Sequence, residues 1–84
     1  MPEAGAAWQN LRTQLRERLG ETGFRRWLEP VAGAVAETDA DGLVLTLALP
    51  TRFMRDWVEA HYGDTIRALW LQSVKRGRVE FTVA

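Results

Sequence analysis

The residue types that most often carry out catalysis are scarce in this chain. The only histidine is His61, the only serine is Ser73, and there is no cysteine. One imidazole without cysteine partners is a poor ligand set for a metal such as zinc. Neither GxxxxGK[ST] nor GxGxxG occurs, so no phosphate-cradling loop is predicted. We therefore predict that the protein is not an enzyme and uses no cofactor or metal.

A glycine pattern and two basic clusters point to a different chemistry. Gly20 and Gly23 form a Gly-x-x-Gly sequence between two predicted helices, the position at which KH domains clamp a nucleic-acid backbone. Glu21 inside this pattern opposes phosphate binding. The pattern therefore fits either a simple helix–helix turn or a weak, KH-like site for single-stranded nucleic acid. Contacts for the second reading would come from Arg25, Arg26, Lys75, Arg76 and Arg78.

The aromatic residues fall into two groups. Most lie on apolar stripes of predicted helices or strands, which predicts core packing; these are Trp27, Trp57, Tyr62, Trp70 and Phe81. Trp8 heads a narrow Leu11–Leu15 stripe that does not need it, and Phe53 stands in the first turn of its helix beside Arg52. Since tryptophan and other aromatics are favoured at interface centres, Trp8 and Phe53 are candidates for partner contact.

Periodicity predicts the elements that position these residues. Leucines and Trp8 at helical spacing indicate a first helix, and a second short helix follows Gly20–Gly23 and stops at Pro30. Residues 33–49 read as a β-hairpin, Thr51 as the cap of a long helix, and residues 78–83 as a closing strand. Gly63-Asp64 could kink or restart the long helix. The predicted fold is α+β, with the order α-α-β-β-α-β, a three-stranded sheet packed by helices and a KH-like arrangement as one form of it.

Composition limits the class of protein. The chain has 84 residues and formal net charge 0, so it lacks the basic excess of a protein that grips duplex DNA. No apolar run approaches the ~20 residues of a membrane span, and the N-terminus has no basic region typical of a signal peptide. We expect one domain over residues 1–84, with residues 1–6 flexible, in the cytoplasm.

The motifs taken together resemble the N-terminal domain (domain I) of the bacterial replication initiator DnaA. The resemblance covers roughly residues 7–83 and rests on the spacing of Trp8 and Leu11 and on two longer motifs. These motifs are Phe24-x2-Trp27-Leu28-x-Pro30 and Pro50-x-Arg52-Phe53-x2-Asp56-Trp57.

The resemblance implies a non-catalytic interaction module. It implies self-association through the first helix, giving a weak homodimer or a pair with a full-length initiator, at Ala7, Trp8 and Leu11. It also implies recruitment of the replicative helicase and initiation regulators, and weak binding of single-stranded DNA. The helicase and regulator surface would fall on Glu21, Gly23, Trp27, Thr51 and Phe53. Gly23 stands where well-known members carry an acid, and Glu21 would substitute for it. The ATPase and helix-turn-helix portions of an initiator are not in this sequence.

Overall fold

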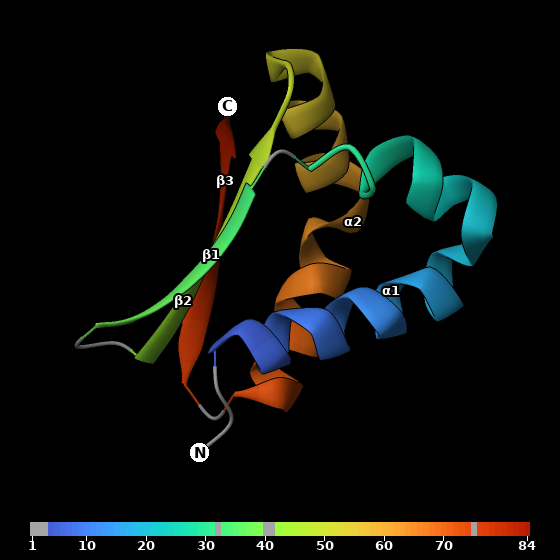
Figure 1. Cartoon of the computed structure of the whole chain (residues 1–84). Coiled ribbons are helices and arrows are strands. Elements are labelled where there is room, and N and C mark those ends of the chain that lie inside the picture. Colours follow the sequence, from blue (N-terminus) through green and yellow to red (C-terminus); the bar gives the residue numbers. More distant parts are fainter. Residues whose placement is uncertain (1–3, 32, 40–41, 75) are drawn as a thin grey trace.

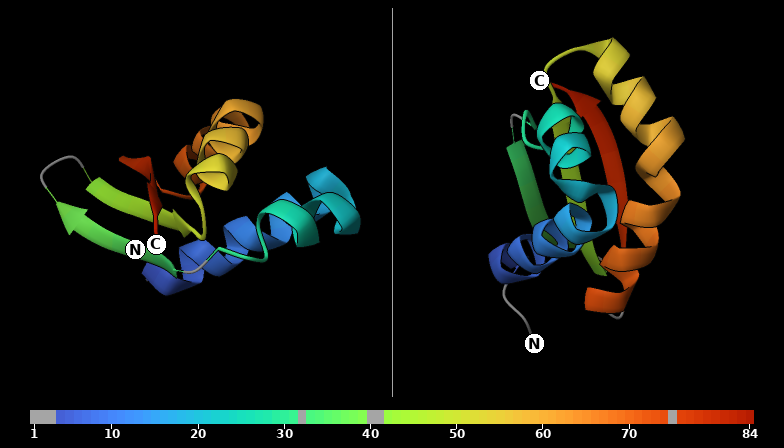
Figure 2. Two further views of the ribbon diagram at one scale, coloured as in Figure 1. Left: turned by 90° about the horizontal axis from the view of Figure 1, so that it is seen from above. Right: turned by 90° about the vertical axis from the view of Figure 1, so that its right-hand side faces the viewer.

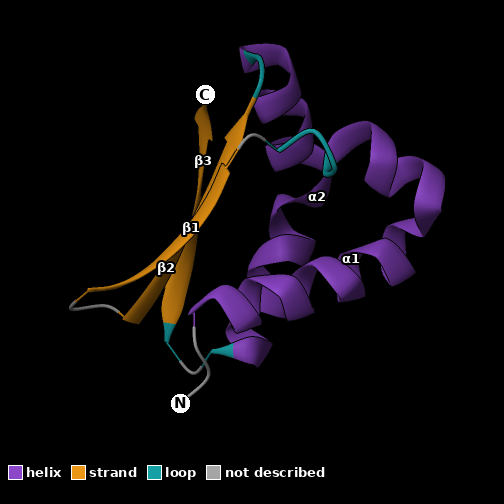
Figure 3. Cartoon of the chain, in the orientation of Figure 1, coloured by secondary structure: helices purple, strands orange, loops and turns teal. Residues whose placement is uncertain are grey.

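The fold is α+β, as the sequence predicts, and has two long helices and three strands (Figures 1 and 3). The computed structural model describes residues 4–31, 33–39, 42–74 and 76–84. The elements follow the order α1 (Ala4–Trp27), β1 (Gly33–Asp39), β2 (Gly42–Leu49), α2 (Arg52–Ser73) and β3 (Gly77–Val83). α1 begins inside the stretch expected to be flexible, residues 1–6.

α1 consists of two helical segments joined at a kink. Gly20 has φ 78° and ψ 163°, a backbone conformation that glycine adopts without steric cost. The predicted helix pair is therefore present. The connection between the two helices is Gly20 alone, which is shorter than the expected turn over residues 20–23. The second segment ends at Trp27, three residues before Pro30.

The sheet has β2 in the centre. β1 pairs with β2 in the antiparallel sense, which confirms the predicted hairpin, and Ala36 lies opposite Leu45 in its register. β3 pairs with β2 in the parallel sense after the α2 crossover, with Leu45 opposite Val79. The alternating leucines of β2 are all buried, as their period of two predicts: Leu43, Leu45, Leu47 and Leu49.

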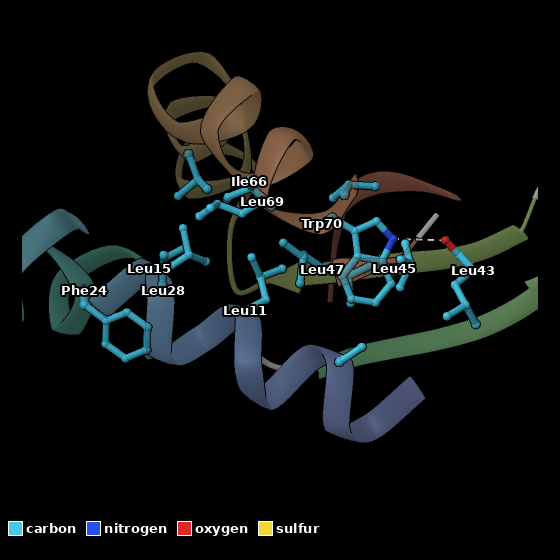
Figure 4. Close-up of a cluster of buried hydrophobic side chains, with 14 of the residues drawn as sticks. Leu11, Leu15, Phe24, Leu28, Leu43, Leu45, Leu47, Ile66, Leu69 and Trp70 are labelled. Carbon is cyan, nitrogen blue, oxygen red and sulfur yellow. Dashed lines mark hydrogen bonds between the residues drawn. The ribbon is translucent and has the colours of Figure 1, made fainter. Parts of the chain in front are cut away.

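The core lies between the central strand and the two helices, which cross one another on one side of the sheet (Figures 1 and 2). Side chains from α1, β2 and α2 point toward each other there (Figure 4). Trp70 is fully buried and its indole Nε1–H donates a 3.0 Å hydrogen bond to the carbonyl oxygen of Leu43 (Figure 4). The prediction that Trp70 is a core residue is confirmed.

α2 is a continuous helix, without the interruption considered at Gly63-Asp64. It begins as predicted, because the Thr51 hydroxyl accepts a 3.1 Å hydrogen bond from the backbone N–H of Met54. Within the described residues, neither helix has the length and apolar character needed to cross a membrane.

Candidate functional site

A strip of aromatic side chains lies on the surface where the end of α1 meets the first half of α2. Phe53, Trp57 and His61 follow one another at four-residue spacing, so they lie on one face of α2. Trp27, the last residue of α1, packs beside them. These four residues are called the aromatic strip below. Phe53 is 68% exposed and His61 is also exposed, while Trp27 and Trp57 are half-buried.

Trp57 is enclosed between two other rings. The Trp27 and Trp57 rings stack with centroids 3.7 Å apart and planes 7° apart, and the His61 ring stacks on Trp57 at 4.0 Å and 25°. Two rings this close to one face of the same indole would overlap each other. Trp27 and His61 therefore cover opposite faces of Trp57. Phe53 lies beside Trp27, and the centroids of their two rings are 6.4 Å apart.

The kink at Gly20 and the short segment after it bring Trp27 to this place. Phe24 on this segment and Leu28 directly after it are buried in the core, which fixes the segment against the rest of the domain (Figure 4). Tyr62 meets the Trp57 ring edge-on at 5.4 Å. A Cβ built on Gly23 would lie 3.8 Å from the Tyr62 hydroxyl, which is an ordinary van der Waals contact. Any side chain at position 23 would therefore contact α2.

Charges of both signs surround the aromatic strip. The Arg26 guanidinium lies 5.3 Å from the centroid of the Trp27 ring, within the range of a cation–π contact. Arg25 contacts the carboxylates of Glu21 at 3.4 Å and Glu29 at 4.0 Å. On the outer side of α2, Asp56 is exposed and pairs with Arg55 at 2.8 Å.

The predicted docking residues are partly brought together. Trp27 and Phe53 adjoin, and Thr51 precedes Phe53 with its hydroxyl occupied by the helix cap. Glu21 and Gly23 lie on the same segment as Trp27, with Glu21 exposed and Gly23 half-buried.

The predicted self-association residues lie mostly inside the domain. Ala7 is 3% exposed and Leu11 is fully buried, so neither side chain offers area to a partner in this structure. Trp8 is half-buried and packs against the core, and the Arg12 guanidinium lies 5.9 Å from its ring centroid. Of the three, only Trp8 presents a side chain at the surface.

The predicted nucleic-acid contacts do not form one patch. Arg25 and Arg26 adjoin the first half of α2 through Trp27, whereas Arg76 and Arg78 follow its C-terminal end. From residue 57 to residue 73 the helix rises roughly 24 Å. Arg78 bonds Glu80 at 3.0 Å. Lys75 lies outside the described residues.

Within the described part of the chain, no three His, Cys, Asp or Glu side chains gather as a metal site would require. A shallow hollow between the start of α1 and the end of α2 contains no titratable side chain; its lining is Ala6, Ala7, Gln9, Asn10, Thr13 and Ser73. His61 stacks on Trp57 instead of facing a nucleophile.

Four aromatic assignments from the sequence need correction. Each is half-buried and packs against the edge of the core instead of lying inside it: Trp27, Trp57, Tyr62 and Phe81. The sequence did not lead us to predict that Trp57 and His61 belong to a surface strip. The four-residue spacing from Phe53 to His61 is the signal that could have indicated it.

The fold and this surface define a class: a small α+β domain that carries aromatic side chains at its surface and, in its described part, gathers no three His, Cys, Asp or Glu side chains into a metal site. Comparison with known proteins is consistent with that class. The model of the DnaA N-terminal domain family matches residues 5–72. The chain therefore belongs to the DnaA N-terminal domain family.

Individual relatives of the chain carry the name of the same family. The chain is 41% identical over 64 residues to the chromosomal replication initiator protein DnaA of Gluconobacter oxydans, an alignment of 76% of this chain and 12% of that protein. It is 32% identical over 84 residues to the protein of the same name from Xanthobacter autotrophicus, covering 95% of this chain and 15% of the relative. The corresponding protein of Mesorhizobium japonicum is 31% identical over 70 residues. The chain thus spans about one-eighth to one-seventh of the length of these relatives. The family and these relatives support a role in the initiation of DNA replication.

Proposed function

We propose that this domain is a non-catalytic protein-interaction module of bacterial replication initiation, which recruits the replicative helicase and initiation regulators and self-associates. The observation that carries the proposal is Phe53. A phenylalanine that is 68% exposed beside two stacked tryptophans is costly to leave in water and is well suited to the centre of an interface. Membership of the DnaA N-terminal domain family supports this proposal, and the location that we propose for the domain is the cytoplasm.

The helicase interaction is tested by a matched pair of variants. Leu71 is also a large exposed apolar residue of α2, at 51%, but lies near the other end of the helix. Phe53→Ala should weaken binding of the purified replicative helicase by about tenfold or more in a calorimetric titration, as for an interface hot spot. Leu71→Ala should bind normally. Equal affinities for wild type and Phe53→Ala would remove Phe53 from the docking surface.

Self-association is proposed at Trp8, because Ala7 and Leu11 are buried. Trp8→Ala should lower the mean mass of the domain in a concentration series by analytical ultracentrifugation. An unchanged profile for this variant would place any self-association elsewhere.

The alternative function is a KH-like, weak site for single-stranded DNA. Its support is the glycine kink between two helical segments and the exposed Arg26 and Arg52, which have no carboxylate partner among the described residues. Such binding should weaken steeply between about 50 mM and 200 mM salt, because phosphate contacts release counterions. No binding of an oligothymidylate at the lower salt concentration would exclude it.

A further inference from the structure

The stacking inside the aromatic strip bears on which class of macromolecule this surface can bind. Sequence-tolerant binding of single-stranded nucleic acid uses aromatic rings whose faces are open, because each base stacks on a ring face. The largest ring system of the strip, Trp57, has Trp27 on one face at 3.7 Å and His61 on the other at 4.0 Å. Neither face is open to a base.

The neighbouring charges favour the same conclusion. Asp56 and Asp64 follow Phe53 and His61 by three residues each, so they lie beside the strip on α2, and both side chains are exposed. These carboxylates, which contact Arg55 at 2.8 Å and Arg67 at 3.7 Å respectively, place acceptors where a phosphate backbone running along the helix would lie. On the α1 side, Arg25 already contacts Glu21 and Glu29. Arg26 and Arg52 attract phosphate only at the Phe53 end.

From this geometry we propose that the strip docks a protein segment, and that His61 is a specificity-determining residue, because it covers the Trp57 face that would otherwise stack a nucleobase. The segment would bring an apolar anchor to Phe53 and Trp27 and at least one basic side chain to Asp56 or Asp64. The inference rests on the proposed docking function and extends its surface from Phe53 along α2 to His61.

His61 also positions the surface that the partner meets. Its ring holds Trp57 against Trp27, and Trp27 in turn ties the segment after the Gly20 kink to α2. Loss of the imidazole leaves one face of Trp57 in water and frees the Trp57 side chain to leave Trp27. His61 therefore affects protein binding through Trp57 and Trp27 as well as through its own exposed ring.

The test uses His61→Ala and His61→Phe in parallel. Two probes are titrated: the replicative helicase, and an oligothymidylate of about 15 nucleotides, a length in the range that single-strand-binding sites occupy. His61→Ala should bind helicase about 2- to 10-fold more weakly, the size of one aromatic contact. It should bind the oligonucleotide more tightly than wild type and with stronger quenching of tryptophan fluorescence, because one Trp57 face is open.

His61→Phe is the rescue variant, since a phenyl ring covers the same indole face. It should match the wild type with both probes. Thermal unfolding by circular dichroism checks that each variant folds, and the signal from two stacked indoles reports whether Trp27 and Trp57 stay together. A merely structural role of His61 would not make oligonucleotide binding tighter.

Two outcomes overturn the proposal. One is a folded His61→Ala variant that binds both probes as the wild type does. The other is a wild type that binds the oligonucleotide with strong fluorescence quenching that His61→Ala loses, which would assign the strip to nucleic acid. Failure of the proposed function has a different signature, since helicase binding would then be insensitive to Phe53→Ala while the oligonucleotide result for His61→Ala still holds.

Discussion

Trp70 near the C-terminal end of α2 and Trp57 near its N-terminal end lie in different surroundings. Trp70 is covered by the sheet, fully buried, and its indole N–H is satisfied by the Leu43 carbonyl. Trp57 is flanked by Trp27 from the short second segment of α1, by His61 and by Tyr62, and remains half-buried. The same helix thus buries Trp70 against the sheet near its end and carries a surface of stacked rings near its start. This contrast predicts that substitutions in the two halves separate stability from binding.

The largest expected effect on stability is that of Trp70→Ala. Removing a fully buried indole leaves a cavity and removes the hydrogen bond to the Leu43 carbonyl, so the free energy of unfolding should fall by about 3–5 kcal/mol. Urea denaturation followed by circular dichroism measures it. A loss below about 1 kcal/mol would contradict the view that this end of α2 anchors the core.

The next effect concerns the contact between the sheet and Trp70. A Cβ on Gly77 would lie 2.2 Å from the Leu43 oxygen and 3.0 Å from Trp70 Nε1, so it would displace the carbonyl and the indole that are hydrogen-bonded. Gly77→Ala should cost about 1–3 kcal/mol of unfolding free energy, the range for overpacking a filled site.

Gly5→Ala is the matched control for Gly77→Ala. No atom lies within 4 Å of a Cβ at Gly5, which is in the first turns of α1. This control should be neutral or stabilising by up to about 1 kcal/mol in the same urea experiment. Similar losses for both glycines would show that the close approach at Gly77 has no energetic consequence.

Trp57→Ala tests the other half of α2. Because Trp57 is half-buried at the edge of the core, we expect a smaller loss of about 1–2 kcal/mol, together with loss of the circular-dichroism signal from its stacking on Trp27. Helicase affinity should fall at the same time. Trp57→Phe keeps a ring between Trp27 and His61 and should retain most of the stability and most of the helicase affinity. A Trp57→Ala loss as large as that of Trp70→Ala would remove the contrast between the two ends.

Much of this fold could be predicted from the sequence because its signals are local. The alternating leucines of β2, the cap at Thr51 and the glycine between the α1 segments each depend on residues a few positions apart. The burial of Trp57 could not be predicted in the same way. Helical periodicity places Trp57 and Trp70 on apolar stripes, but the extent of burial depends on which distant segment covers each stripe.

The candidate site shows the same limit. The exposure of Phe53 was expected from its place in a first helical turn and is observed. Similarity to the family pointed to Ala7 and Leu11 by position, but position carries no information on solvent exposure, and both are buried. The contact of His61 with Trp57 has a local signal, the four-residue spacing, which does not by itself distinguish stacking from two separate side chains.

The smallest expected effect is that of removing the helix cap at the start of α2. Thr51→Ala removes the hydroxyl that accepts the Met54 N–H and should cost about 1 kcal/mol, while Thr51→Asn keeps a side-chain acceptor and should cost little. Since Phe53 lies in the turn that this cap holds, Thr51→Ala should also speed hydrogen exchange at the Met54 amide and leave the amide of Leu69, in the buried half, protected. Equal acceleration at Met54 and Leu69 would mean that the two halves of α2 open together, so that docking surface and core would be one cooperative unit.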